Sequence, residues 1–235
     1  MIPAYNEAKR LPASLDSVMA YLAQASYAFA EVVVVDDGSK DSTAAVVKDY
    51  QRSHACVRLL SNPGNRGKGY SVRHGMLEAK GEWVLFSDAD LSAPIEEISK
   101  LLAAAKKENA AVAIGSRALD RSLVAVHQSG FRELSGRFFN LVMRLLTGLP
   151  FRDTQCGFKL YRADAAKEVF SRQILDGFSF DVEDLCIAKN LGLKTLEVPV
   201  RWSNVEGTKV SALAGLQSFT DLVKIRWYSM SGRYR

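Results

Sequence analysis

The sequence predicts an α/β fold with a mostly parallel sheet flanked by helices. Apolar runs typical of buried strands alternate with helical patterns from the first residue to about position 116. The runs at 32–35 and 83–87 end in aspartate pairs, and an uninterrupted valine run such as 32–35 is typical of a parallel strand buried on both faces. With 235 residues, 48% of them hydrophobic, the chain is long enough to form one large domain.

The predicted elements follow one another as strand, helix and strand. A turn at 3–7 leads to a helix near 11–25 and then to the valine strand. Asp41, Ser42 and Thr43 form a capping pattern that opens a helix running to Arg52. The same patterns predict strands at 56–60, 83–87, 110–115 and 158–161 and helices at 69–79 and 95–108.

The start of the chain has the pattern of a strand end and its loop. Residues 1–7 contain only two apolar positions before Pro3, so we expect a truncated first strand and a fold that lacks a central strand. The sequence leaves open whether a membrane anchor precedes this point.

Asp88 and Asp90 lie at the end of a predicted strand. Residues i and i+2 of a strand point to the same face, so both carboxylates can reach one divalent cation. Oxygen ligands suit Mg²⁺ or Mn²⁺, which keep coordination sites for substrate phosphate. The alternative is a turn that caps the next helix. A second pair, Asp36 and Asp37, favours the metal site, because ligands of open α/β sheets bind beyond the carboxyl ends of strands.

The segment 62–69 is rich in glycine and contains Lys68. It matches neither the P-loop pattern nor the dinucleotide fingerprint, in which Val72 occupies the place of the third glycine. A loop that lets a nucleotide approach its backbone is one interpretation, and a flexible turn is the other.

Composition narrows the class of protein. The three cysteines match no zinc or disulfide spacing, which favours reduced thiols in an intracellular protein. No stretch reaches the roughly 18 apolar residues of a membrane-spanning helix. Residues 199–235 hold six Lys or Arg and two acidic residues, so most of the net charge of +5 lies there. This asymmetry suits an anionic membrane surface or a phosphate-bearing ligand; nucleic acid would also be attracted, but we do not expect it as the partner.

Two helical segments have apolar faces bordered by arginine or lysine. One spans 131–146 and the other 215–228, within a basic C-terminal helix and tail that we separate from the main domain at residues 211–235. Packing on the main domain, residues 1–210, is one interpretation of each segment, and contact with a membrane interface is the other; the two are not exclusive. Asp181 and Glu183 are placed at a helix start, where carboxylates suit the dipole, and we assign neither as a base.

The motifs together resemble family 2 glycosyltransferases of GT-A fold. The resemblance rests on the segments 3–7, 35–39, 65–69, 88–90, 115–117, 153–159, 180–183, 197–200 and 207–210. It is strongest to the polyprenyl-phosphate branch, and within it to the dolichyl-phosphate β-glucosyltransferases. It covers nearly the whole chain.

This resemblance implies roles for individual residues. Asp88 and Asp90 would bind the metal, and Asp90 and Arg117 would be catalytic. Ser92 stands where mannosyl relatives have glutamine, which disfavours the mannosyl assignment and leaves Ser92 as a candidate. The nucleotide-sugar site would comprise Pro3, Ala4, Tyr5, Glu7, Asp36, Lys68, Asp88, Ala89 and Asp90. The acceptor-phosphate site would comprise Arg117, Arg132, Ser135, Gln155 and Lys209.

The chemistry follows from the acceptor. A phosphate monoester is already anionic near neutral pH, so it needs no general base. We expect inverting, metal-dependent transfer of a hexose, glucose from UDP-glucose, to dolichyl or undecaprenyl phosphate at the cytoplasmic membrane face. GDP-mannose is the alternative donor. A phospho-receiver domain and an inactive sugar-nucleotide binder are the alternatives from other classes.

Overall fold

The structure is a computed structural model that describes residues 1–126, 141–204 and 212–235, with the backbone alone at 212–217. Its centre is a twisted sheet built from two groups of strands. The parallel strands β1 (Ile2–Ala4), β2 (Val32–Asp36) and β3 (Val57–Ser61) form one group. The other has the order β4 (Trp83–Ser87), β7 (Phe158–Arg162), β5 (Val112–Ser116) and β8 (Thr195–Pro199).

Strand β1 joins the two groups. The amino group of Met1 donates to the Leu85 carbonyl, and Ser87 N–H donates to the Met1 carbonyl, which is the pattern of parallel strands. The expectation that a central strand would be lacking is therefore wrong. The strand is short, as expected, with 3 residues against 5 in β2 and β4. Buried Ile2 and Ala4 hold it in place.

Strand β7 runs antiparallel to both of its neighbours, β4 and β5, while β5 and β8 are parallel. Because β4 and β5 each run antiparallel to β7, they run in the same direction as each other. The carboxyl ends of β1, β2, β4 and β5 therefore lie at one edge of the sheet, which we call the rim. The expected mostly parallel sheet is confirmed, with β7 as the exception.

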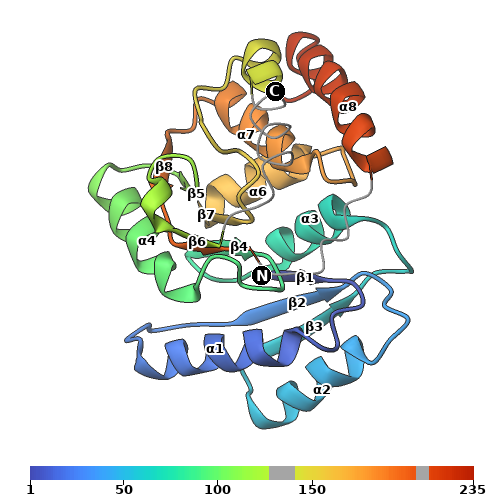
Figure 1. The fold of residues 1–235 in the computed structure, drawn as a ribbon, viewed down its shortest axis with the longest axis vertical. Helices are drawn as coiled ribbons and strands as arrows, with labels where there is room; N and C mark the ends of the chain where they lie inside the picture. Colours follow the sequence, from blue (N-terminus) through green and yellow to red (C-terminus); the bar gives the residue numbers. More distant parts are fainter. Residues whose placement is uncertain (127–140, 205–211) are drawn as a thin grey trace.

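Helices cover both faces of the sheet (Figure 1). Helices α1 (Leu11–Gln24) and α2 (Thr43–Ser53) pack on one face of β1–β3, and α3 (Lys68–Glu78) packs on the opposite face. Helix α4 (Ile98–Lys107), preceded by the 3-10 turn Ile95–Glu97, covers β5 and β7 on the α1 side. Helices α6 (Ala163–Arg172) and α7 (Phe180–Asn190) share the core with α3.

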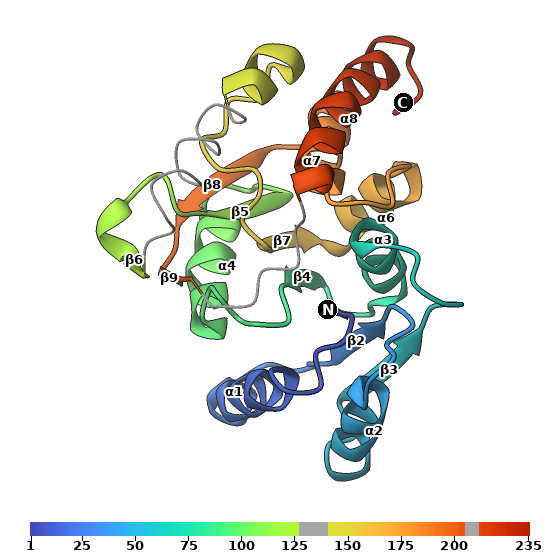
Figure 2. The ribbon, with the colours of Figure 1, turned by 45° about the vertical axis from the view of Figure 1, so that its right-hand side comes forward.

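The C-terminal helix α8 (Ala212–Met230) packs against α7 at the outside of this layer (Figure 2). It corresponds to the helix predicted at 215–228. Most of the helix predicted at 131–146 falls on residues 127–140, which lie outside the described part, and residues 141–147 are helical. A small parallel pair, β6 (Val124–Val126) and β9 (Trp202–Ser203), completes the described fold, together with the 3-10 turn Arg121–Leu123.

The period of the strands explains the layers. Val112 and Ile114 of β5 point into the core shared with α6 and α7, whereas Ala113 points into the core under α4. Phe86 of β4 is fully buried and stacks edge to face on Phe180. In the described part of the chain, no helix is long and apolar enough to cross a membrane.

Candidate functional site

The rim brings together the acidic pairs that the sequence singled out. Asp36 ends β2 and Asp37 follows it, Asp88 and Asp90 follow β4, and Arg117 follows β5. These strands run in the same direction, so their ends meet at one edge. The predicted gathering of four aspartates and Arg117 at one edge agrees with this topology.

Asp88 is held by backbone, by a lysine and by a glycine. Its N–H donates to the Gly157 carbonyl at 3.0 Å, and its Oδ1 lies 2.8 Å from Lys68 Nζ. A side-chain carbon at position 157 would collide with the Asp88 carboxylate. The carboxylate therefore lies against a bare Cα, which gives Gly157 a role that sequence reasoning missed. The antiparallel pairing of Ser87 with Phe158 creates this contact.

Lys68 lies over the rings of two phenylalanines, Phe86 and Phe180. Its Nζ is 5.4 Å from the centre of the Phe86 ring and 5.8 Å from that of Phe180. Burial acts to lower the pKa of Lys68, but the nearby carboxylates of Asp88, Asp181 and Asp90 outweigh it, so the pKa is raised. The lysine stays charged at the position where it contacts Asp88.

Asp90 is oriented by its own turn. Its Oδ1 accepts from the N–H of Ser92 at 3.0 Å and from the Ser92 hydroxyl at 2.9 Å. Leu91 between them has a φ of 45°, a left-handed conformation that an L-residue rarely adopts. The carbonyl of Ala89 accepts from Ser14 of α1 at 2.7 Å. Ser92, a candidate from the sequence, thus contacts Asp90 directly.

Asp37 holds the glycine-rich loop through its side chain, whereas Asp36 contacts the start of this loop through its backbone carbonyl, which accepts from Asn62 N–H at 2.9 Å. Asp37 accepts from Arg66 N–H and Gly67 N–H, each at 2.9 Å, and from the Asn62 amide at 2.8 Å. Asp36 accepts from Ser39 N–H at 3.2 Å. The two neighbouring carboxylates therefore differ: Asp37 shapes the loop that carries Lys68, and Asp36 lies at the end of β2.

The N-terminal loop is fixed beside this edge. Pro3 and Ala4 belong to β1, and the Ala4 carbonyl accepts from Asp37 N–H at 2.8 Å. Tyr5 follows them, and Glu7 forms a bidentate ion pair with Arg10 at 2.7 and 2.8 Å. Glu7 is only 8% exposed, and its carbonyl also caps the start of α1. Its side chain is thus engaged in a local pair.

Arg117 is paired with a carboxylate that the sequence did not single out. Its Nε and Nη2 lie 2.6 and 2.7 Å from the two oxygens of Asp153, and its guanidinium covers Trp202. Burial acts to raise the pKa of Asp153, but Arg117 outweighs it and the pKa is lowered. Glu197 fixes the Asp153 loop by accepting from Asp153 N–H at 2.8 Å. The sequence signal for Asp153 was the motif at 153–159.

The remaining predicted residues are not all placed. Gln155 is exposed beside Asp153. Arg132, Ser135 and Lys209 lie outside the described residues. A cavity of about 450 Å³ lies beside β2 and β4 and is lined mainly by apolar groups such as Val32 and Trp83. Ser87 and Leu91 also line it, but Asp88 and Asp90 do not.

A charged cluster is buried behind the rim. Lys159 of β7 is fully buried and lies 2.5 Å from Asp181 and 3.3 Å from Asp184. The Tyr161 hydroxyl donates to Asp184 at 2.6 Å. Burial raises the pKa of Asp184 to about 7, although Lys159 opposes the shift. Neither Asp181 nor Glu183 was assigned as a base, and the Lys159 contact shows Asp181 in an ion pair.

The donor set at the rim fits a hard divalent cation. Asp88 and Asp90 offer carboxylate oxygens on one turn, and within the described residues no group of three or more His, Cys, Asp or Glu side chains is placed to hold a metal. Mg²⁺ and Mn²⁺ are compatible with two protein carboxylates when phosphate and water complete the coordination. Ligands of open α/β sheets bind at this edge, beyond the carboxyl ends of the strands.

The fold and site define a glycosyltransferase of GT-A type, and comparison with known proteins identifies the family. Residues 1–170 match the model of glycosyl transferase family 2, and the chain belongs to this family. The resemblance seen in the motifs is thereby confirmed, and the phospho-receiver alternative is excluded.

Curated relatives extend over the whole chain. A dolichyl-phosphate beta-glucosyltransferase of Trichomonas vaginalis is 38% identical over 96% of this chain and 71% of its own. The Drosophila melanogaster protein of that name is 39% identical over 100% of this chain and 76% of its own. A solved structure of Mycobacterium tuberculosis glucosyl-3-phosphoglycerate synthase, in complex with Mn²⁺, UDP-glucose and phosphoglyceric acid, has a TM-score of 0.67 at 18% identity, with 96% of this chain and 78% of that chain covered. At this identity the structural likeness shows the fold.

We expect Gly157→Ala to displace Asp88. The added methyl group collides with the carboxylate, and overpacking of this kind costs about 1–3 kcal/mol. Glycosyltransferase activity should fall at least about 10-fold, which corresponds to about 1.4 kcal/mol in the barrier. Gly177→Ala is the matched control, because a methyl group there meets nothing within 4 Å. Equal activity in the two variants would contradict the contact.

We expect Asp184→Asn to change the pH dependence of stability. The pKa of Asp184 is raised in the fold, so between about pH 4 and pH 7 the folded state binds more protons than the unfolded state. Its contribution to stability therefore falls as pH rises, by up to about 1.4 kcal/mol per pH unit. Urea unfolding at about pH 5 and about pH 7 should show a smaller decline in the variant than in the wild type. An identical decline in the free energy of unfolding for the variant and the wild type would contradict the raised pKa of Asp184.

Proposed function

We propose that this protein transfers a glucosyl group from UDP-glucose to the phosphate of a dolichyl-type polyprenyl phosphate, with inversion at the anomeric carbon. The observation that carries the proposal is the rim, where Asp88, Asp90 and Lys68 lie at the carboxyl ends of the strands beside a glycine-rich loop. Relatives named dolichyl-phosphate beta-glucosyltransferase, at 38 and 39% identity over nearly the whole chain, support the choice of glucose and of the lipid phosphate.

The reaction forms one bond and breaks one. An oxygen of the acceptor phosphate attacks the anomeric carbon, and the bond between that carbon and the diphosphate oxygen breaks, with its electron pair leaving on UDP. The acceptor is anionic at neutral pH and needs no proton removed. The site therefore has to align the acceptor phosphate with the anomeric carbon and to balance the negative charge of the diphosphate. Because no general base is needed, Asp181 and Asp184 can be paired with Lys159 without impairing the reaction.

The charge balance would come from the residues of the rim. Asp88 and Asp90 would hold Mg²⁺ or Mn²⁺, which when bound neutralises the diphosphate leaving group. Lys68, now paired with Asp88, would contact a diphosphate oxygen from the glycine-rich loop. Pro3, Tyr5 and Asp36 at the ends of β1 and β2 are proposed to surround the nucleoside.

The acceptor phosphate is proposed to approach from the side of β5. Arg117 has a fixed orientation through Asp153, and Gln155 is exposed on the same loop. The pairing with Asp153 removes net charge from Arg117, so further cations are needed. Arg132, Ser135 and Lys209 are proposed for this role from the motifs that contain them.

Helix α8 offers a surface for the lipid bilayer. Val223 and Trp227 are each 60% exposed, and Met230 is 71% exposed. Leu141 and Leu145 of the helical turn 141–147 are also exposed. Lys224, Arg226 and Arg233 accompany these apolar side chains in α8 and its tail. A polyprenyl phosphate resides in a membrane, so we propose peripheral contact with an anionic cytoplasmic surface through this face.

Asp88→Asn and Asp90→Asn should each abolish transfer, with a loss of about 100-fold or more, because the cation site loses a charged ligand. The measurement is transfer of labelled glucose from UDP-glucose to dolichyl phosphate, with GDP-mannose and undecaprenyl phosphate run in parallel. Wild-type activity should vanish with a chelator and return with Mn²⁺. Asp49→Asn, at an exposed pair with Arg52 on α2, is the matched control. Chelator-resistant transfer, or full activity in either rim variant, would contradict the proposal.

Trp227→Ala should weaken binding to vesicles that contain anionic lipid by about 3- to 10-fold, since an exposed aromatic anchor is lost. Binding of the wild type should also weaken at high salt, because screening shortens the reach of the basic residues. Phe29→Ala removes a similarly exposed aromatic residue near α1, 57% exposed, and should leave binding unchanged. Sedimentation with vesicles measures all three proteins. Salt-independent binding, or no binding by the wild type, would overturn the membrane proposal.

A further inference from the structure

The tail after α8 folds back into the protein. Tyr234 is fully buried, and its hydroxyl donates to Oε1 of Glu183 at 2.8 Å. Glu183 lies in the first turn of α7 and is itself fully buried. A buried carboxylate requires hydrogen-bond donors to offset the loss of hydration. Removing the Tyr234 hydroxyl therefore leaves the Glu183 carboxylate with one donor fewer, which is unfavourable in the folded state.

The same carboxylate holds the segment 173–176, the first part of the connection between α6 and α7. Glu183 Oε1 accepts from Ile174 N–H at 3.0 Å, and Oε2 accepts from Leu175 N–H at 2.8 Å. With the Tyr234 hydroxyl this makes three donors on one buried group. Glu183 is thus the point at which the tail and the segment 173–176 meet.

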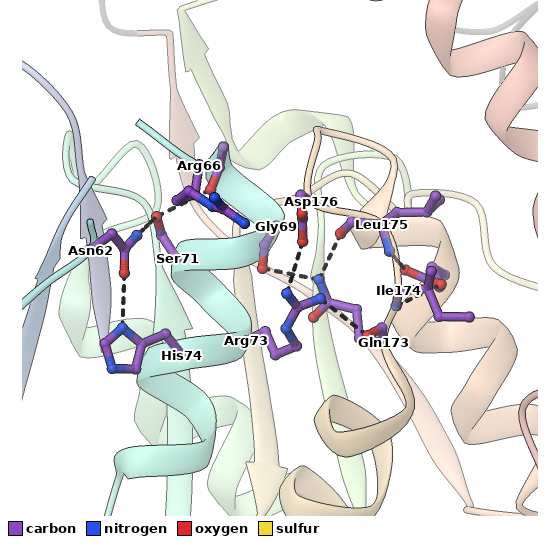
Figure 3. A network of polar contacts seen from close by, with 12 residues as sticks. Asn62, Arg66, Gly69, Ser71, Arg73, His74, Gln173, Ile174, Leu175 and Asp176 are labelled. Atoms are coloured by element: carbon purple, nitrogen blue, oxygen red, sulfur yellow. Dashed lines mark hydrogen bonds and ion pairs between the residues drawn. The ribbon is translucent and has the colours of Figure 1, made fainter. Parts of the chain in front are cut away.

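The segment 173–176 in turn forms hydrogen bonds with the amino-terminal part of α3 (Figure 3). The Gln173 amide donates to the carbonyls of Gly69 and Leu175, each at 2.9 Å. Tyr70 N–H donates to the Asp176 carbonyl at 3.2 Å, and Arg73 pairs with the Asp176 carboxylate at 2.9 Å. A side-chain carbon at Gly69 would lie 2.5 Å from the Leu175 carbonyl oxygen, so the two backbones touch.

The glycine-rich loop is therefore held from two sides. Asp37 binds Arg66 N–H and Gly67 N–H from β2, and the segment 173–176 binds Gly69 and Tyr70 from the other side. Lys68 lies between these anchors and reaches Asp88 at 2.8 Å. Any shift of the second anchor changes where Lys68 can place its charge.

We propose that Glu183 and Tyr234 are positioning residues for the binding of a nucleoside diphosphate: the tail hydroxyl orients Glu183, Glu183 fixes the segment 173–176, and this segment fixes the loop that carries Lys68. The inference rests on the proposed function, because it takes the glycine-rich loop as the donor-diphosphate loop. It adds a residue of the C-terminal tail to the determinants of donor affinity. A second contact, from the Ser179 hydroxyl to Asp221 of α8 at 2.9 Å, ties α8 to the same end of α7.

The test compares Tyr234→Phe with Tyr228→Phe in the full chain. Tyr234→Phe removes one hydroxyl and keeps the buried ring. The ring centre of Tyr228 lies 5.9 Å from that of Tyr234, and the Tyr228 hydroxyl makes no hydrogen bond within the described residues, so Tyr228→Phe is the matched control. Calorimetry with UDP and Mn²⁺ should give about 3- to 10-fold weaker binding for Tyr234→Phe and wild-type binding for Tyr228→Phe. In transfer assays the KM for the donor should rise while kcat stays within about 2-fold.

Hydrogen exchange separates positioning from general destabilisation. The amides of Ile174 and Leu175 should exchange faster in Tyr234→Phe well below its unfolding temperature, and should be unchanged in Tyr228→Phe. Gln173→Ala breaks the next contact in the chain and should weaken UDP binding in the same direction. If Tyr234→Phe folds poorly, Gln173→Ala takes its place in the UDP-binding test.

Three outcomes decide the inference. Unchanged UDP affinity in both Tyr234→Phe and Gln173→Ala, with wild-type binding intact, would overturn it and leave the proposed function standing. A fall in thermal stability without any change in UDP affinity, donor KM or exchange at 174–175 would also overturn it, since the contact would then be structural only. If the wild type binds no UDP in the presence of Mn²⁺, both the proposed function and the donor half of the inference fail.

Discussion

The geometry of the rim depends on the antiparallel strand β7. Because β7 lies between β4 and β5 and runs against both, its start brings Gly157 beside Asp88. The missing side chain leaves room for the carboxylate, and the Gly157 carbonyl holds the Asp88 backbone. The position of one acidic group is thus set by sheet register and by the absence of a single methyl group, which no local preference of the sequence around Asp88 would supply.

Electrostatics then order the groups around it. Lys68 and Arg117 carry the cationic charge of the described rim, and each is paired with a carboxylate, Asp88 and Asp153 respectively. Ion pairs give little net stability once desolvation and lost side-chain entropy are counted, so these partly buried pairs are better understood as fixing orientation. Lys159 between Asp181 and Asp184 does the same one layer deeper. The site is therefore organised by charge before any ligand arrives.

Sequence reasoning predicted those parts of the structure that follow from local patterns. The valine strand, the acidic strand at 83–87 and the helices 11–25 and 69–79 agree with the structure to within about a residue or two, because apolar periodicity determines them. The meeting of Asp36, Asp37, Asp88 and Asp90 followed from the rule for parallel strands. Partners distant in sequence were not predictable: Asp153 for Arg117, Gly157 for Asp88 and Tyr234 for Glu183 arise from register and topology. The presence of the central strand β1 was missed because three strand residues give too weak a periodic signal.

The contact between Tyr234 and Glu183 joins residues 51 positions apart. During synthesis the amino-terminal half, with its parallel strands and the glycine-rich loop, emerges long before this tyrosine does. The loop can form early, but its second anchor reaches its final form only after Tyr234 has been made. A nascent chain that stops short of Tyr234 would therefore contain every acidic group of the rim and still lack a correctly held Lys68, which couples completion of the site to synthesis of the residues that follow α8.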